Sequence, residues 1–151
     1  RATAPADPPP CDLVLVGSGG SQADEVAAAA DDHVRLTGFV DDASLADLYR
    51  RATLLVFPSS YEGFGLPVAE AMAHGCPALV AQNSSLIEVG GDAAIPLDDP
   101  SADGIARALT DALSDRDALA ARGDRSRHHA QMFDWDDVAR RTLDVYRETM
   151  R

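Results

Sequence analysis

Short runs of apolar residues alternate along the chain with longer segments in which apolar positions recur at helical spacing. The runs cover residues 12–17, 34–37, 54–57, 77–81 and 93–96. The first run, Asp-Leu-Val-Leu-Val-Gly, is almost continuously apolar, which is typical of a strand buried on both faces. We therefore expect each run to form a short strand.

Helical spacing and end signals predict helices between the strands and over the last third of the chain. The expected helices cover residues 21–32, 41–52, 66–75, 101–114, 115–132 and 135–150, with a short turn at 85–89. Ser21, Asp41 and Asp134 suit N-cap positions, because their side-chain oxygens accept hydrogen bonds from free backbone amides. On the last helix, Trp135 and Tyr146 are spaced as side chains that pack into the core.

Strands that alternate with helices predict an α/β fold, with a doubly wound, Rossmann-like parallel sheet and helices on both faces. In such sheets, ligands bind beyond the carboxyl ends of the strands. We therefore expect a site in the loops that follow Val16, Leu36, Phe57 and Val80.

Composition and charge limit the partners of this chain. Its 151 residues are the size of one domain, and we expect a disordered lead-in or linker remnant at 1–11 before a domain at 12–151. The net charge is −12, and every basic residue is arginine, which disfavours nucleic acid and anionic membranes as partners. Cys11 and Cys76 indicate neither a disulfide framework nor a metal site. We expect a cytoplasmic protein without metal or cofactor.

The loops after the first two strands carry weak chemical signals. Gly17-Ser-Gly-Gly20 leaves backbone amides open to a phosphate, although a tight structural turn explains these glycines equally well. The loop is not a dinucleotide-binding motif, because Gln22 stands where G-x-G-x-x-G requires its last glycine. The loop Gly38-Phe-Val40 indicates no function by its side chains.

The loop after the third strand carries the strongest signal. Gly63 and Gly65 leave amides unshielded, and Pro67 opens a helix whose first turn has free N–H groups at its positive end. This arrangement suits a pyrophosphate and needs no lysine. Glu62 and Glu70 flank the helix start, where carboxylates accept hydrogen bonds from pairs of sugar hydroxyls. Alternatively, Glu62 caps the helix and Glu70 is a surface residue, although an unpartnered carboxylate on this largely apolar helix costs stability.

Here the sequence resembles a known family. The string Glu62-Gly-Phe-Gly-Leu-Pro-Val-Ala-Glu70 is similar to the E-x7-E motif of the retaining family-4 glycosyltransferases, which have the GT-B fold. Segments 14–19, 34–40 and 87–92 resemble the C-terminal, nucleotide-sugar donor-binding half of those enzymes in the same order. The resemblance covers nearly the whole chain from Asp12 onward.

The resemblance implies a role for each motif residue. Glu62 is expected to be the catalytic residue, in contact with the transferred sugar, and Glu70 is expected to bind the ribose hydroxyls. The main chain of the glycine loop is expected to meet the sugar hydroxyls and the distal phosphate. The resemblance implies these further donor-binding residues: Gly63, Phe64, Gly65 and Leu66 in that loop, Val40, whose main chain meets the nucleobase, and Gly17, Ser18 and Gly19 on the phosphate side of the cleft.

The implied activity is transfer of a hexose from GDP- or UDP-hexose to an acceptor hydroxyl with retention of configuration, in polysaccharide or glycolipid biosynthesis. The chain departs from the family, because the strand that opens this domain and the Arg and Lys that follow it are missing. We expect a donor domain truncated at its N-terminal strand and inactive alone. Its parent would supply an N-terminal acceptor-binding domain and any membrane contact. The alternatives are a non-catalytic partner subunit, a nucleotide-sugar epimerase and a Rossmann dehydrogenase.

Overall fold

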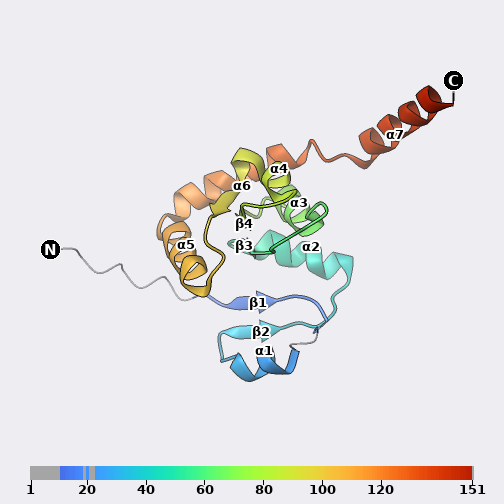
Figure 1. The fold of residues 1–151 in the computed structure, drawn as a ribbon. Coiled ribbons are helices and arrows are strands. Elements are labelled where there is room, and N and C mark those ends of the chain that lie inside the picture. Colours follow the sequence, from blue (N-terminus) through green and yellow to red (C-terminus); the bar gives the residue numbers. More distant parts are fainter. Residues whose placement is uncertain (1–10, 19, 21–22, 151) are drawn as a thin grey trace.

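The computed structural model describes residues 11–18, 20 and 23–150 (Figure 1). Gly19, Ser21 and residues 1–10 of the lead-in expected at 1–11 lie outside the described residues. In chain order the elements are β1 (Leu13–Leu15), α1 (Ala23–Ala29), β2 (Val34–Leu36), α2 (Asp42–Arg51), β3 (Leu55–Phe57), α3 (Leu66–Ala73), β4 (Ala78–Ala81), α4 (Leu86–Gly90), η1 (Gly91–Ala93), β5 (Ile95–Leu97), α5 (Ala102–Ser114), α6 (Arg116–Ala130) and α7 (Trp135–Thr149).

The strands pair in parallel, which confirms the predicted α/β fold class. β4 lies between β3 and β5, with Leu55 opposite Ala78 and Leu79 opposite Ile95. β1 pairs with β2 in a second, two-stranded parallel sheet. The strands are thus divided between two sheets, and β1 and β3 each keep one edge that no described strand pairs with.

The core surrounds β4. All four residues of this strand are buried, as expected for a strand covered on both faces. The largest fully buried side chains include Met72 and Val68 of α3, Leu86 of α4 and Leu79 of β4 itself. A smaller cluster joins Tyr49 of α2 to Cys76, whose thiol is free. The helix that carries Glu70 of the E-x7-E motif is therefore part of this core.

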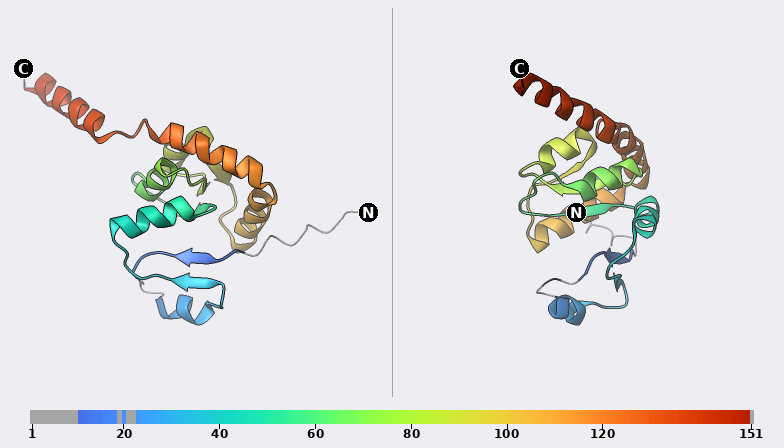
Figure 2. Two further views of the ribbon diagram at one scale, coloured as in Figure 1. Left: turned by 180° about the vertical axis from the view of Figure 1, so that it is seen from behind. Right: turned by 90° about the vertical axis from the view of Figure 1, so that its right-hand side faces the viewer.

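β1 does not reach this core. The expectation that residues 12–17 form a strand buried on both faces is wrong, since the side chains of Leu13 and Leu15 are 48% and 37% exposed. Figures 1 and 2 show β1, β2 and α1 as a group at one side of the larger sheet. Because none of the residues of α1 is buried, the apolar residues of β1 have little to pack against.

α6 packs against α3 and fixes its C-terminal end. A Cβ added at Gly123 would lie 2.5 Å from the carbonyl oxygen of Gly75, so only glycine allows this approach. Arg127 of α6 also donates a hydrogen bond to the carbonyl oxygen of His74, the C-cap residue of α3. Both contacts hold α3 in place from the side opposite its entry loop.

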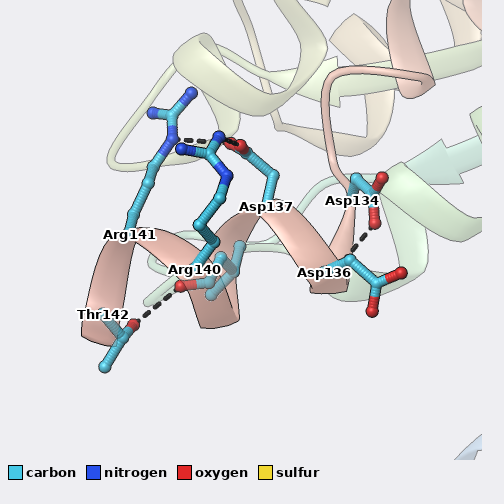
Figure 3. A network of polar contacts seen from close by, with 7 residues as sticks. Asp134, Asp136, Asp137, Arg140, Arg141 and Thr142 are labelled. Atoms are coloured by element: carbon cyan, nitrogen blue, oxygen red, sulfur yellow. Dashed lines mark hydrogen bonds and ion pairs between the residues drawn. The ribbon is translucent and has the colours of Figure 1, made fainter. Parts of the chain in front are cut away.

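α7 begins where the sequence predicts. Asp134 is its N-cap and accepts a hydrogen bond from the amide of Asp136 at 2.8 Å. Asp137 forms ion pairs with Arg140 and Arg141, three and four residues along the helix (Figure 3). These pairs are local to one exposed helix surface, so they support the helix itself and not its docking on the rest of the protein.

α7 does not join the core. It projects away from the other elements in Figure 1 and in the left view of Figure 2, and none of its residues is buried. The prediction that Trp135 and Tyr146 are core residues is therefore wrong, with 74% and 58% of these side chains exposed. Helical spacing of apolar residues defines a face but does not specify what covers it.

No helix among the described residues is long and apolar enough to cross a membrane.

Candidate functional site

The loop from Pro58 to Gly65 leaves the carboxyl end of β3 and leads into α3. Gly65 is the N-cap of α3, and its φ of +99° is a conformation that favours glycine. Among the described residues, none accepts a hydrogen bond from the amides of Phe64, Gly65 and Leu66. These N–H groups lie at the positive end of the α3 dipole, so they are suited to bind an anion.

Glu70 lies on the exposed side of α3. The residues that flank it, Val68, Ala69, Ala71 and Met72, are all buried, whereas Glu70 itself is exposed. Helical geometry turns these neighbours toward the core and turns Glu70 away from it. Glu70 is therefore not buried with its apolar neighbours, and its carboxylate is accessible to a ligand.

An open pocket of about 470 Å³ lies between this loop, the turn after β4 and the segment that follows α6. Its wall combines two carboxylates and three hydroxyl groups with aromatic and apolar surface, a mixture that suits a sugar ring. The lining residues are Tyr61, Glu62, Gly63, Phe64, Ser84, Ser85, Glu88, Val89, Met132 and Phe133. Three predicted site residues, Glu62, Gly63 and Phe64, thus share one pocket. The predicted residues Gly65, Leu66 and Glu70 follow on in the chain but do not line it.

Aromatic contacts hold the loop against α6. The ring of Phe64 meets the edge of Phe133 at a centroid distance of 5.6 Å, and Phe133 meets His129 in the same way at 5.7 Å. The Nε2 atom of His129 lies 3.0 Å from the carbonyl oxygen of Val89, in hydrogen-bonding contact. This chain of contacts connects the motif loop, α6 and α4 around the pocket.

Two serines at the pocket were not identified from the sequence. The amide of Glu62 donates to Ser84 Oγ at 3.1 Å, and Ser85 Oγ donates to the carbonyl oxygen of Phe64 at 2.8 Å. The signal available was their position, because they follow β4 at the same edge of the sheet as the motif loop. A polar pair at that edge could have been tested as a partner for the loop.

Tyr49 of α2 connects Glu70 to the smaller core cluster. Its hydroxyl group donates to Glu70 Oε2 at 3.4 Å, and its ring stacks on His74 at a centroid distance of 6.1 Å. Burial, followed by the negative charge of Glu70, raises the pKa of Tyr49 to about 12. The phenol thus stays protonated at neutral pH and can donate to the carboxylate.

We expect Tyr49→Phe to flatten the alkaline pH dependence of stability. The raised pKa means that the folded protein holds the phenol proton more tightly than the unfolded chain, whose pKa is near 10.0. This contribution is fully present below about pH 10 and is lost as the pH rises toward about 12. The variant should therefore lose less stability than the wild type over this interval, measured by urea unfolding at a series of pH values.

The matched control for this experiment is Tyr146→Phe, which removes the hydroxyl of an exposed tyrosine on α7. Burial also raises the pKa of the Cys76 thiol to about 11. Because Cys76 is present in all three proteins, its contribution cancels in the comparison. Equal slopes for the wild type and Tyr49→Phe would contradict the assignment of the titration to Tyr49.

The other predicted donor residues gather at a second place. The amide of Gly17 donates to the carbonyl oxygen of Gly38 at 3.0 Å, so the first and second loops lie together and Ser18 follows directly. Val40 lines a separate pocket of about 620 Å³ between β2 and α2. Among the described residues, no hydrogen bond connects this group to the motif loop. Gly19 lies outside the described residues.

Comparison with known sequences identifies one family model, described as glycosyl transferases group 1, which matches residues 2–115. The chain is similar to the O-antigen chain mannosyltransferase B of Escherichia coli, with 38% identity over 76% of this chain and 30% of that protein. It is also similar to the phosphatidyl-myo-inositol mannosyltransferase of Mycolicibacterium smegmatis, with 34% identity over 91% of this chain and 37% of that protein. The chain therefore spans about a third of the length of these relatives.

Solved structures resemble the fold over nearly its full length. Sucrose-phosphate synthase from Thermosynechococcus elongatus matches with a TM-score of 0.83 and 27% identity over 92% of this chain and 38% of that one. Anabaena Alr3699/HepE, solved with UDP and glucose, matches with a TM-score of 0.81 and 21% identity over 93% of this chain and 41% of that one. The arrangement of strands and helices is thus shared with one part of larger proteins.

Proposed function

This chain belongs to the glycosyl transferases of group 1, and on that premise we propose that it is the donor-binding part of a glycosyltransferase that uses a nucleotide-diphospho-sugar. The observation that carries the proposal is the entry to α3, where the amides of Phe64, Gly65 and Leu66 have no acceptor among the described residues. An anion such as a diphosphate satisfies these amides and is stabilised by the helix dipole. The protein needs no lysine for this contact despite its net charge of −12.

Each of the two motif carboxylates would bind a different part of the donor. Glu62 lines the pocket beside the loop, so we assign it to the hydroxyl groups of the transferred hexose near the reacting carbon. Glu70 is exposed further along α3 and is assigned to the ribose hydroxyls. Gly17, Ser18, Gly19 and Val40 complete the proposed donor site on the side of the first two loops.

The proposed reaction transfers a hexose with retention of configuration. The bond from the anomeric carbon to the distal phosphate oxygen breaks while a bond from that carbon to the acceptor oxygen forms on the same face. The hydroxyl proton of the acceptor leaves with the nucleoside diphosphate. Stabilising the charge that develops on this leaving group is the main electrostatic task. The proposal assigns that task to main-chain amides of this chain and includes no metal ion.

We also propose that this chain is part of a longer parent protein. The chain spans about a third of the curated relatives named above, so the acceptor domain and the choice of acceptor are assigned to the rest of the parent. The edges that β1 and β3 leave free are suited to a further parallel strand of the same domain. We propose that this chain alone transfers no sugar and that the parent works in the cytoplasm, where free thiols such as Cys11 and Cys76 are stable.

Titration with UDP and with GDP tests the proposal. UDP is included because Alr3699/HepE was solved with it. GDP is included because the family resemblance implies either a GDP-hexose or a UDP-hexose as donor. In isotope-labelled protein, the expected result is saturable binding of one nucleotide that shifts the amide signals of residues 64–66. Saturable binding that leaves those signals unchanged would overturn the assigned site. Failure of both nucleotides to bind, in this chain and in the longer parent, would overturn the function.

A further inference from the structure

The motif loop has little regular structure of its own, so something else must fix its shape. Residues 58–65 belong to neither a helix nor a strand. Backbone groups in such a segment must find partners outside the ladders of secondary structure or be satisfied by water. The loop carries Glu62 and the amides at the entry of α3, whose positions decide how a ligand is held.

The turn formed by Asn83, Ser84 and Ser85 supplies these partners. Asn83 Nδ2 donates to the carbonyl oxygen of Ser59 at 3.0 Å, and Ser84 Oγ accepts from the amide of Glu62 at 3.1 Å. Ser85 Oγ lies within 3.0 Å of the carbonyl oxygen of Glu62 and 2.8 Å of that of Phe64, so it donates to both in a shared bond. One turn of three residues thus contacts the loop along most of its length.

The turn itself is firmly held. It follows β4, the fully buried central strand. Ser84 Oγ donates to Asn83 Oδ1 at 3.0 Å, and the amide of Leu86 donates to the carbonyl oxygen of Asn83 at 3.1 Å. Leu86, the next residue after the turn, is completely buried. The turn can therefore act as a rigid support for the more open loop.

The Ser85 hydroxyl contacts the motif loop and does not cap the helix that begins beside it. It occupies the N-cap position of α4, where a serine hydroxyl commonly accepts a hydrogen bond from a backbone amide of the first turn. No such capping bond is formed here. The hydroxyl instead donates across to the two loop carbonyl groups, which indicates that the contact with the motif loop is the arrangement the fold favours.

We propose that the turn of Asn83, Ser84 and Ser85 positions the motif loop, and that Ser85 is thereby a positioning residue for the sugar part of the donor. The proposal rests on the proposed function, because it assigns the pocket to the transferred hexose. Ser85 acts through the backbone of Glu62 and Phe64. Its loss lets the loop sample other shapes, and a ligand must then select the competent one, which lowers its apparent affinity.

Two measurements test this proposal on the wild type, Ser85→Ala and Ser85→Thr. Amide hydrogen exchange without ligand reports the support directly, and Ser84→Ala is added because Ser84 Oγ accepts from the amide of Glu62. We expect exchange at the amide of Glu62, which donates to Ser84 Oγ, to rise about two- to tenfold in Ser84→Ala and also in Ser85→Ala, since this is the range of one hydrogen bond. Ser85→Thr keeps a hydroxyl group and should restore the wild-type rates.

The second measurement is the affinity for UDP-glucose and GDP-mannose compared with UDP and GDP. Ser85→Ala should weaken binding of the recognised nucleotide sugar about two- to tenfold and change binding of the nucleoside diphosphate less, with recovery in Ser85→Thr. The matched control is Ser114→Ala, which removes another hydroxyl-to-carbonyl bond at the exposed end of α5. This control should leave both measurements unchanged.

The outcomes separate this proposal from the proposed function. Unchanged exchange in Ser85→Ala and Ser84→Ala would overturn the positioning role and leave the function intact. Faster exchange with unchanged affinity for a nucleotide sugar that the wild type binds would also overturn it. If neither the wild-type chain nor its parent binds any of the four ligands, the proposed function fails, and the positioning role fails with it.

Discussion

Replacing Glu70 with glutamine should weaken binding of the recognised nucleoside diphosphate by about 10- to 100-fold. Each bond from a ribose hydroxyl to the carboxylate is charge-assisted and contributes about 1.5–3 kcal/mol, whereas a neutral bond to the glutamine amide contributes about 0.5–1.5 kcal/mol. For two such bonds the difference is about 2 kcal/mol, and each 1.4 kcal/mol is a factor of ten. The amide of glutamine keeps the shape of the side chain and can still accept from Tyr49, which lies 3.4 Å from Glu70 in the wild type. Because Glu70 is exposed, the change should leave the fold stable.

A control and a modified ligand make this test specific. Glu148→Gln, at an exposed position on α7, changes the net charge equally and should leave affinity unchanged. The 2′,3′-dideoxy form of the same nucleotide should bind the wild type weakly and should lose nothing further in Glu70→Gln, because the interaction is already removed. Calorimetric titration measures all of these affinities. A similar loss with the dideoxy nucleotide would show that Glu70 does not act through the ribose.

Replacing Gly65 with alanine should destabilise the protein by at least about 2 kcal/mol and abolish measurable donor binding. Its φ of +99° is strained for any residue with a Cβ, at a cost of about 1–3 kcal/mol. The added Cβ would also lie 2.6 Å from Leu86 Cδ2. Leu86 is completely buried, so it has little room to move, and overpacking adds about 1–3 kcal/mol.

The loss of binding in Gly65→Ala has a separate cause. Gly65 is the N-cap of α3, so relief of the contact with Leu86 must shift the first turn of that helix. The free amides of Phe64 and Leu66 move with it and no longer converge on one anion. Urea unfolding and nucleotide titration, both at a temperature where the variant remains folded, measure the two effects.

Gly63→Ala is the matched control for stability. Gly63 lies in the same loop, but nothing is within 4 Å of a Cβ added there. Its alanine variant should therefore change the free energy of unfolding by no more than about 0.5 kcal/mol. If both variants lost the same stability, the loss would come from a general intolerance of the loop to side chains and not from the left-handed backbone at Gly65.

Local physical chemistry made the order and type of the elements predictable. Asp41 caps α2 by accepting from the amide of Ser44 at 2.8 Å, as its place before a helical pattern indicates. Pro67 lies in the first turn of α3, as predicted. A strand, β4, forms within the apolar run at 77–81, as predicted. Each of these outcomes depends on residues that are close together in the chain.

Burial was less predictable than element type. The apolar pattern of β1 suggested a strand covered on both faces, and the pattern of α7 suggested a core helix, yet Leu13 and Trp135 are 48% and 74% exposed. Periodicity records which residues share a face, but burial requires a second surface that meets this face. Whether such a surface is present depends on the placement of whole elements.

The candidate site shows the same division. The sequence by itself determined that Glu62, Gly65 and Glu70 surround the start of one helix, because their spacing and the proline between them act within a few residues. Only the tertiary structure decided that Ser85 supports the loop and that Tyr49 donates to Glu70, contacts that span 21 to 23 positions of the chain. A hydroxyl group carries no local sign of its distant partner, because that contact exists only after the packing of β4 and α3 has brought the two segments together.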